Sequence, residues 1–225
     1  MNWLRWLPES VSTFGGDIDA LFAIIFRGAA IWLFVTIGAL LLFAVRFRRR
    51  EGIRAKYIRG DSLREAAWIL VPVLVVLALD LWLDFRGAPV WARVKLEMPP
   101  SDVQLQVTAM QFNWEVLYPG PDGRFGTEDD RQVDNELHVP VNTPVRVALK
   151  SKDVLHSFFL PNLRLKQDII PGRTIPAWFE VTRPGRYELA CAELCGFGHS
   201  GMRGWLYVHT PEEYRAWQRE QWPPS

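Results

Sequence analysis

The chain has 225 residues, enough for one large domain or for a small domain with appendages. Its net charge of +1 points to no particular partner, but the charge is unevenly distributed. Residues 46–64 hold eight basic residues against only Glu51 and Asp61. Such a run can bind nucleic acid. Both flanks of this run are long and hydrophobic, however, so we expect no nucleic-acid partner.

Two apolar runs flank the basic segment. The first, residues 21–45, has Arg27 as its only charge, and its last 18 residues are uninterrupted, which suffices to cross a bilayer. Arg27 lies near the outer end, where its side chain can reach the interface. The second uncharged run, residues 66–79, could alone be a buried core helix. Beside the first run and the basic loop it instead predicts a membrane hairpin, with helices over 21–45 and 65–85.

The basic loop also predicts an orientation. Cytoplasmic loops carry an excess of Lys and Arg, so residues 46–64 are expected inside a bacterial-type cell. Residues 1–20 and everything after residue 85 then lie on the extracytoplasmic, periplasmic side of a two-pass plasma-membrane protein. The N-terminal residues lack the basic region, the prompt apolar stretch and the cleavage site of a signal peptide. We therefore expect the first helix to be retained.

After Pro89 the sequence pattern changes from long apolar runs to short β-type segments separated by turn residues. Eight strands are expected, over residues 103–109, 112–118, 137–139, 145–150, 155–160, 177–181, 187–190 and 205–208. This spacing indicates a β-sandwich or barrel spanning residues 90–210. Residues 211–225 form a tail that begins as a short helix, with Thr210 as N-cap and Pro211 at the first position.

One loop of the β-region, residues 119–131, clusters Asp122, Glu128, Asp129 and Asp130 among glycines. Clustered carboxylates suit a calcium ion, although the spacing is not that of an EF-hand. A solvated acidic turn is the favoured interpretation, and a docking surface for a basic partner is a third.

The two cysteines of the chain, Cys191 and Cys195, lie four positions apart, and His199 and Met202 follow closely. Thiolate, thioether and imidazole ligands together favour copper or zinc over hard cations. A segment between two strands can turn so that these four side chains converge. His156, from a separate strand, would complete the set.

Other interpretations of this cluster are a disulfide, a zinc site and a mononuclear blue-copper site. A Cys191–Cys195 disulfide would close too short a loop to constrain the unfolded chain much. A methionine ligand argues against zinc, and a blue-copper site would leave one cysteine idle. Two thiolates bridging two coppers use every residue of the cluster, and this is the favoured interpretation.

The pattern Cys-x-Glu-x-Cys-x3-His-x2-Met, preceded by Asp-Val-Leu-His-Ser-Phe and Ile-Pro-Gly-Arg, resembles the CuA domain of subunit II of haem–copper oxidases. The resemblance covers nearly the whole chain. It implies a membrane-anchored all-β protein, in which a two-helix transmembrane hairpin precedes a cupredoxin-like Greek-key β-sandwich.

The resemblance also implies a ligand set for two coppers. Cys191 and Cys195 bridge both metals, and His156 and His199 each bind one. Met202 is a weak axial ligand to one copper, and the main-chain carbonyl of Glu193 binds the other. A rigid β-sandwich keeps such a centre from reorganising when it gains or loses an electron.

Two acidic residues acquire further roles from the resemblance. The side chain of Glu193 is expected to face a magnesium or manganese ion at the border with the large subunit. Glu65 falls where many relatives place a carboxylate at the mouth of a proton pathway. The alternative for Glu65 is a helix N-terminal residue, capped by Asp61 or Ser62.

The chain departs from the family pattern at one aromatic position. Relatives often have Gln-Trp-x-Trp, whose first tryptophan accepts electrons from cytochrome c, whereas this chain has Gln111-Phe112-Asn113-Trp114. Phe112 therefore occupies the electron-accepting position, and Trp114 is either a deeper step on the route or a core aromatic. The chain contains no Cys-x-x-Cys-His, so no c-type haem is expected on it and the donor is another polypeptide.

The function implied is an electron-accepting subunit of a respiratory oxidase. Electrons would come from a cytochrome c or a small copper protein and pass to haem in catalytic subunit I, which reduces dioxygen to water beside the other oxidase subunits and membrane lipid. The alternative is the same module in a haem–copper nitric oxide reductase. A less favoured third hypothesis is a membrane-anchored copper-binding or assembly protein without turnover.

Overall fold

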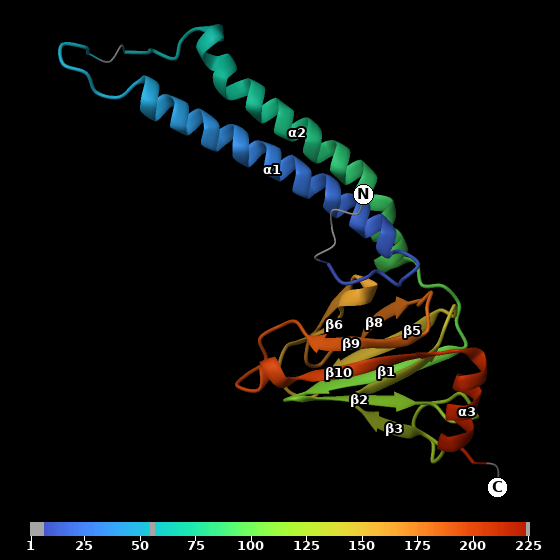
Figure 1. Ribbon diagram of the computed structural model, residues 1–225. Coiled ribbons are helices and arrows are strands. Elements are labelled where there is room, and N and C mark those ends of the chain that lie inside the picture. The colour runs from blue at the N-terminus through green and yellow to red at the C-terminus, as the bar shows by residue number, and fades with distance from the viewer. Residues whose placement is uncertain (1–6, 55–56, 224–225) are drawn as a thin grey trace. The chain divides into compact units, whose positions relative to one another are not determined.

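The computed structural model describes residues 7–54 and 57–223, which form two compact units (Figure 1). One unit is helical and spans Asp19–Val90. The other combines the described residues up to Ile18 with those from Trp91 onward. The first residues of the expected 1–20 segment, and Lys56 of the basic loop, lie outside the described residues.

The helical unit contains most of α1 (Gly15–Arg46) and most of α2 (Leu63–Trp91). Both are long and apolar enough to cross a membrane, and the most apolar stretch of each is entirely unburied in the structure. A short π-helical turn, η1 (Ala92–Leu96), follows α2 directly. The Glu65 carboxylate accepts a hydrogen bond from the Gly60 N–H at 2.9 Å, and the Ser62 hydroxyl accepts one from the Glu65 N–H at 3.3 Å. Glu65 is thus part of the N-terminal cap of α2.

The β-unit is a sandwich of two five-stranded sheets, ordered β3-β2-β1-β5-β8 and β4-β10-β9-β6-β7. Within each sheet one pair is parallel, β1 with β5 and β10 with β4, so chain neighbours are interleaved with distant strands. The strands are β1 (Val103–Met110), β2 (Asn113–Tyr118), β3 (Arg131–Asp134), β4 (Glu136–Pro140), β5 (Val145–Ser151), β6 (His156–Leu160), β7 (Leu165–Ile169), β8 (Ile175–Phe179), β9 (Gly185–Cys191) and β10 (Arg203–His209). This confirms the predicted cupredoxin-like sandwich.

Alternation of apolar and polar residues explains why the sheets pack face to face. In β1, Leu105, Val107 and Ala109 are buried, while the residues between them are more accessible. All eight expected strands are present. The sequence missed β3 and β7, which are edge strands whose exposed residues are mostly polar, so neither carries a strong apolar signal.

The residues before α1 pack against the sandwich. The Val11 N–H donates to the Asn162 carbonyl at 2.8 Å, and the Val11 carbonyl accepts from the Thr182 N–H at 2.8 Å. Val11 and Phe14 are buried, and the Phe14 ring meets Trp178 edge-on at 5.6 Å between centroids. Described residues on both sides of the helical unit therefore belong to one compact body.

The last helix of the described residues is α3 (Pro211–Gln221), where the sequence predicted a short helix. Its N-terminus is closed by a capping box in which Thr210 and Glu213 exchange hydrogen bonds. Trp217 is the buried residue of the helix, and its ring packs against Tyr118 and His138. In Figure 1, α3 and the β9–β10 loop lie at opposite ends of β10.

Candidate metal centre

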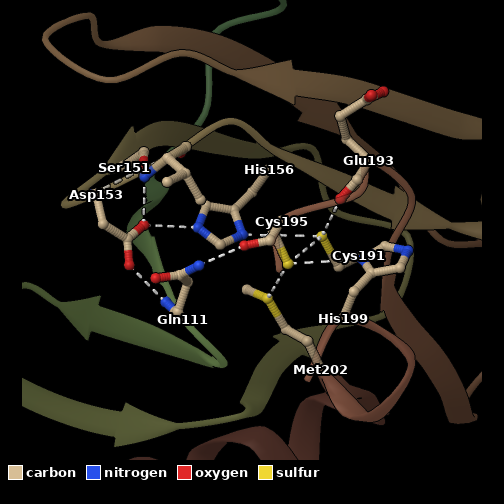
Figure 2. A network of polar contacts seen from close by, with 10 residues as sticks. Gln111, Ser151, Asp153, His156, Cys191, Glu193, Cys195, His199 and Met202 are labelled. Atoms are coloured by element: carbon tan, nitrogen blue, oxygen red, sulfur yellow. Dashed lines mark hydrogen bonds and ion pairs between the residues drawn. The ribbon is translucent and has the colours of Figure 1, made fainter. Parts of the chain in front are cut away.

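Three loops, β1–β2, β5–β6 and β9–β10, meet at the end of the sandwich remote from α3. The β9–β10 loop carries Cys195, His199 and Met202, and it begins at Cys191, the last residue of β9. His156 opens β6 beside it, and β6 pairs directly with β9. These five side chains converge (Figure 2), and we refer to them as the sulfur–imidazole cluster.

The sulfur atoms form the middle of the cluster. Both cysteines are free and buried, and their Sγ atoms lie 3.8 Å apart, far longer than the bond of about 2.05 Å in a disulfide. The Met202 Sδ atom lies 3.8 Å from Cys195 Sγ, and the Glu193 carbonyl oxygen lies 3.3 Å from Cys191 Sγ. The Met202 thioether thus lies beside Cys195, and the Glu193 carbonyl lies beside Cys191.

Each of the two histidines faces one thiol through the same ring nitrogen. His156 Nδ1 lies 3.8 Å from Cys191 Sγ, and His199 Nδ1 lies 3.5 Å from Cys195 Sγ. His156 is completely buried, and its other nitrogen, Nε2, donates to the Asp153 carboxylate at 2.8 Å. A donor set of two thiols, two imidazoles and a thioether is soft and fits copper.

The surroundings of Cys195 favour the neutral form of its thiol. Burial and the neighbouring Cys191 thiol raise the pKa of Cys195 to about 11. Burial would also raise the pKa of Asp153, but hydrogen bonds from His156 and from two backbone N–H groups outweigh it and lower that pKa. A metal cation would therefore displace thiol protons while Asp153 stays ionised.

Two glycines allow the loop to lie close to the β1–β2 turn. Gly196 has a φ of +136°, and a Cβ there would stand 2.6 Å from the Gln111 amide nitrogen. A Cβ on Gly198 would stand 2.5 Å from the ring of Phe112. A side chain at Gly196 would have to displace the Gln111 amide, and one at Gly198 would have to displace the Phe112 ring. Gly196 also has a backbone conformation that other residues rarely adopt.

The two aromatic candidates occupy different depths. Phe112 is partly exposed and covers the loop at Gly198, whereas Trp114 is completely buried. The Trp114 ring lies 6.4 Å from the His156 ring and 5.9 Å from Phe158, centroid to centroid. Its indole N–H has no hydrogen-bond partner among the described residues. Phe112 thus borders both solvent and the β9–β10 loop.

The carboxylates of the remaining acidic candidates are not part of the sulfur–imidazole cluster. The Glu193 carboxylate points away from the sulfur atoms although its carbonyl points towards them (Figure 2). Glu65 belongs to the helical unit. The carboxylates of the 119–131 loop accept hydrogen bonds from within the loop, from Gly126 N–H to Asp130 and from Thr127 to Asp129. These contacts favour the solvated acidic turn.

Sequence reasoning overlooked two polar residues beside the cluster. Asp153 precedes His156 by three positions, and Gln111 begins the β1–β2 turn; both hydrogen-bond to cluster residues. An acidic residue just before a candidate metal-binding histidine was the available signal, because such histidines commonly donate their second N–H to a carboxylate. For Gln111 no local signal exists, because its contact depends on the folded loop.

Comparisons with known proteins agree with this geometry. The family described as "Cytochrome C oxidase subunit II, periplasmic domain" matches residues 104–206, which include the whole sulfur–imidazole cluster. Cytochrome c oxidase subunit 2 of Thermostichus vulcanus is 31% identical, over 95% of this chain and 78% of that protein. An alternative cytochrome c oxidase subunit 2 of Bradyrhizobium diazoefficiens is also 31% identical, over 96% and 83% respectively.

Among solved structures, the periplasmic domain of subunit II of the cytochrome oxidase of Bradyrhizobium japonicum is 32% identical. It covers 56% of this chain and 96% of that one, with a TM-score of 0.49. The sandwich and its soft-ligand site define a copper-binding, membrane-associated electron-transport protein. The chain belongs to the cytochrome c oxidase subunit II family, whose members are part of haem–copper oxidase complexes.

Proposed function

We propose that the sulfur–imidazole cluster holds a dinuclear copper centre, CuA, which accepts electrons for a respiratory oxidase. The observation that carries this proposal is the paired arrangement of ligands. Each of two buried thiols, 3.8 Å apart, faces one imidazole Nδ1 and one weaker donor, either Met202 Sδ or the Glu193 carbonyl. Two bridging thiolates would complete two equivalent metal positions.

The protein's own contribution is to fix these ligands and to exclude water. Cys191, Cys195 and Met202 are buried at the end of two hydrogen-bonded sheets. A dinuclear copper centre bound there would carry one electron at a time, with its charge shared over both metals. Ligands held in a packed site move little when that charge changes, which favours rapid transfer at low driving force.

Electrons would arrive over Phe112. Its ring is partly exposed and packs on the copper-ligand loop, so a donor protein can approach it closely. Trp114 lies deeper, near His156, and is a second candidate on this route. A cytochrome c or a small copper protein would supply the electrons, which would pass on to haem in subunit I for dioxygen reduction.

Two further roles are proposed for acidic residues. The Glu193 carboxylate points away from the sulfurs and is free to face a magnesium or manganese ion at the subunit border. Glu65 sits at the N-terminus of α2, where it could admit protons. Its carboxylate already accepts the Gly60 N–H, so the capping role competes with the proton role.

The proposed topology is a two-pass hairpin in the plasma membrane, with helices over about residues 21–45 and 65–85 and a cytoplasmic loop over 46–64. The 90–210 domain and the 211–225 tail would face the periplasm. Packing of Val11 and Phe14 on the sandwich supports this, because the segments before α1 and after α2 must then lie on one side.

The oxidase function is tested on the complex purified from membranes. With reduced cytochrome c as donor, we expect consumption of oxygen in an oxygen electrode and none of nitric oxide in a nitric-oxide electrode. Nitric oxide consumption without oxygen consumption would instead support the alternative, a subunit of a haem–copper nitric oxide reductase. If a complex that retains copper and haem consumed neither oxygen nor nitric oxide, this result would contradict an electron-transfer role.

A further inference from the structure

A chain of hydrogen bonds joins the sulfur–imidazole cluster to one carboxylate behind it (Figure 2). His156 Nε2 donates to Asp153 Oδ1 at 2.8 Å, and the main-chain N–H of Gln111 donates to Asp153 Oδ2 at 2.7 Å. The side-chain amide of Gln111 then donates to the Cys195 carbonyl at 2.5 Å. Three loops, β5–β6, β1–β2 and β9–β10, are thereby connected through two side chains.

The carboxylate is itself held in place. The Val154 N–H donates to Asp153 Oδ1 at 2.6 Å, and the Asp153 N–H donates to the Ser151 hydroxyl at 3.3 Å. With His156 and Gln111, the carboxylate accepts three hydrogen bonds. A charged acceptor with several donors is a firm anchor, since such bonds are stronger than neutral ones.

The Asp153 contact decides which nitrogen of His156 can bind a metal. A neutral imidazole carries one N–H, and the other nitrogen keeps a lone pair. Donation of Nε2–H to Asp153 leaves the lone pair on Nδ1, which faces Cys191 Sγ at 3.8 Å. The same bond fixes the orientation of the ring.

The Gln111 contact involves the backbone of the second cysteine, Cys195. Its amide nitrogen binds the Cys195 carbonyl immediately before Gly196, where a Cβ would stand only 2.6 Å away. The absence of a side chain at Gly196 therefore permits this close approach. The backbone that carries the Cys195 thiol is tied to the β1–β2 turn by this one amide.

We propose that Asp153 and Gln111 are positioning residues of the copper site. Asp153 presents His156 Nδ1 to the metal, and Gln111 ties the Cys195 backbone to the same carboxylate. This inference rests on the proposed copper function and deepens it. Residues of this kind do not bind the metal, yet their loss commonly weakens metal binding about 10–100-fold.

The variants are Asp153→Ala, its conservative counterpart Asp153→Asn, and Gln111→Ala. Two matched controls remove the same side-chain types elsewhere. Asp168→Ala removes an aspartate of β7 that accepts hydrogen bonds from Ser157 of β6 and from Lys166 of β7, and Gln132→Ala removes an exposed glutamine on β3. Circular dichroism of each full-length chain in detergent checks folding. Asp153→Asn keeps an acceptor oxygen for His156 and should keep the wild-type tautomer. If Asp153→Ala does not fold, Asp153→Leu, which also lacks an acceptor, takes its place.

The first measurement needs no copper. The chain has only four histidines, so imidazole nitrogens can be observed by NMR in metal-free, full-length protein labelled with 15N-histidine. We expect His156 to carry its proton on Nε2 in the wild type and in both controls, and to lose this preference in Asp153→Ala. An unchanged tautomer in Asp153→Ala would overturn the role of Asp153.

The second measurement is copper retention against a competing chelator, with the EPR spectrum of the loaded protein. We expect affinity to fall ~10–100-fold in Asp153→Ala and in Gln111→Ala, with neither control affected. Wild-type affinity and spectrum in Gln111→Ala would overturn the role of Gln111. A wild-type chain that binds no copper would instead refute the proposed function, whatever the tautomer of His156.

Discussion

The two ends of the sandwich each hold two of the four histidines, but they hold them for different purposes. At the loop end, His156 and His199 turn Nδ1 towards sulfur. At the α3 end, His138 Nδ1 and His209 Nε2 hydrogen-bond to each other at 2.9 Å, and His138 Nε2 bonds to Glu136 at 3.1 Å. Ring nitrogens already paired in this way are not available to a metal.

The residues around the two histidine pairs also differ between the two ends of the sandwich. The His138 ring is stacked between Tyr207 and Trp217, each 4.8 Å away between centroids, with no sulfur in the stack. β10 links the two ends, from Arg203 beside the cluster to His209 beside α3. A histidine therefore becomes a candidate ligand here when one ring nitrogen faces a sulfur atom rather than a second imidazole ring.

Cys195→Ser should have the largest effect, because it removes one of the two thiolates that would bridge the metals. We expect the dinuclear centre to be lost completely while the sandwich stays folded, since the two side chains are of similar shape. Metal analysis and EPR of the purified chain check this. Retention of a wild-type spectrum in this variant would show that Cys195 is no ligand.

Trp217→Ala should produce the opposite phenotype at the α3 end. Loss of this buried ring is expected to cost about 3–5 kcal/mol in the free energy of unfolding, because it leaves a cavity between α3 and the sheet. Copper content should not change. Thermal unfolding and metal analysis of the same preparation make the comparison, and copper loss from the folded variant would contradict the separation of the two ends.

Low pH should weaken the α3 end. Burial lowers the pKa of His138 despite the Glu136 carboxylate, and burial together with His138 lowers the pKa of His209. The unfolded chain then binds more protons than the folded one, so stability falls as pH drops below the ordinary histidine value of about 6.5 towards the lowered values. Thermal unfolding against pH should show a shallower decline in His209→Gln; an equal decline would contradict this assignment.

Met202→Leu should have the smallest effect on the site. The replacement is close in volume, so even at this buried position it should cost less than about 1.5 kcal/mol. Loss of a weak axial thioether should raise the reduction potential of the copper while leaving the copper bound. Redox titration checks the shift. Loss of all copper would contradict the weak-ligand role.

The sequence predicted the two long apolar helices and the sandwich because both depend on hydrophobic patterns that are local in the chain. Most of the cluster could be predicted because Cys191, Cys195, His199 and Met202 lie within twelve consecutive residues, whereas His156 lies on a separate strand and was included only as the histidine that would complete the set. Edge strand β7 was missed because Lys166, Gln167 and Asp168 weaken its apolar signal. The Gln111–Cys195 contact was beyond reach because it joins residues that only the finished fold brings together.

The central claim is that the loop end holds two coppers sharing one electron. Metal analysis and EPR of the wild-type full-length chain, loaded with copper in detergent, test it most directly. The account predicts two coppers per chain and hyperfine splitting from two equivalent copper nuclei. One copper with splitting from a single nucleus, or a chain that binds no copper, would contradict it.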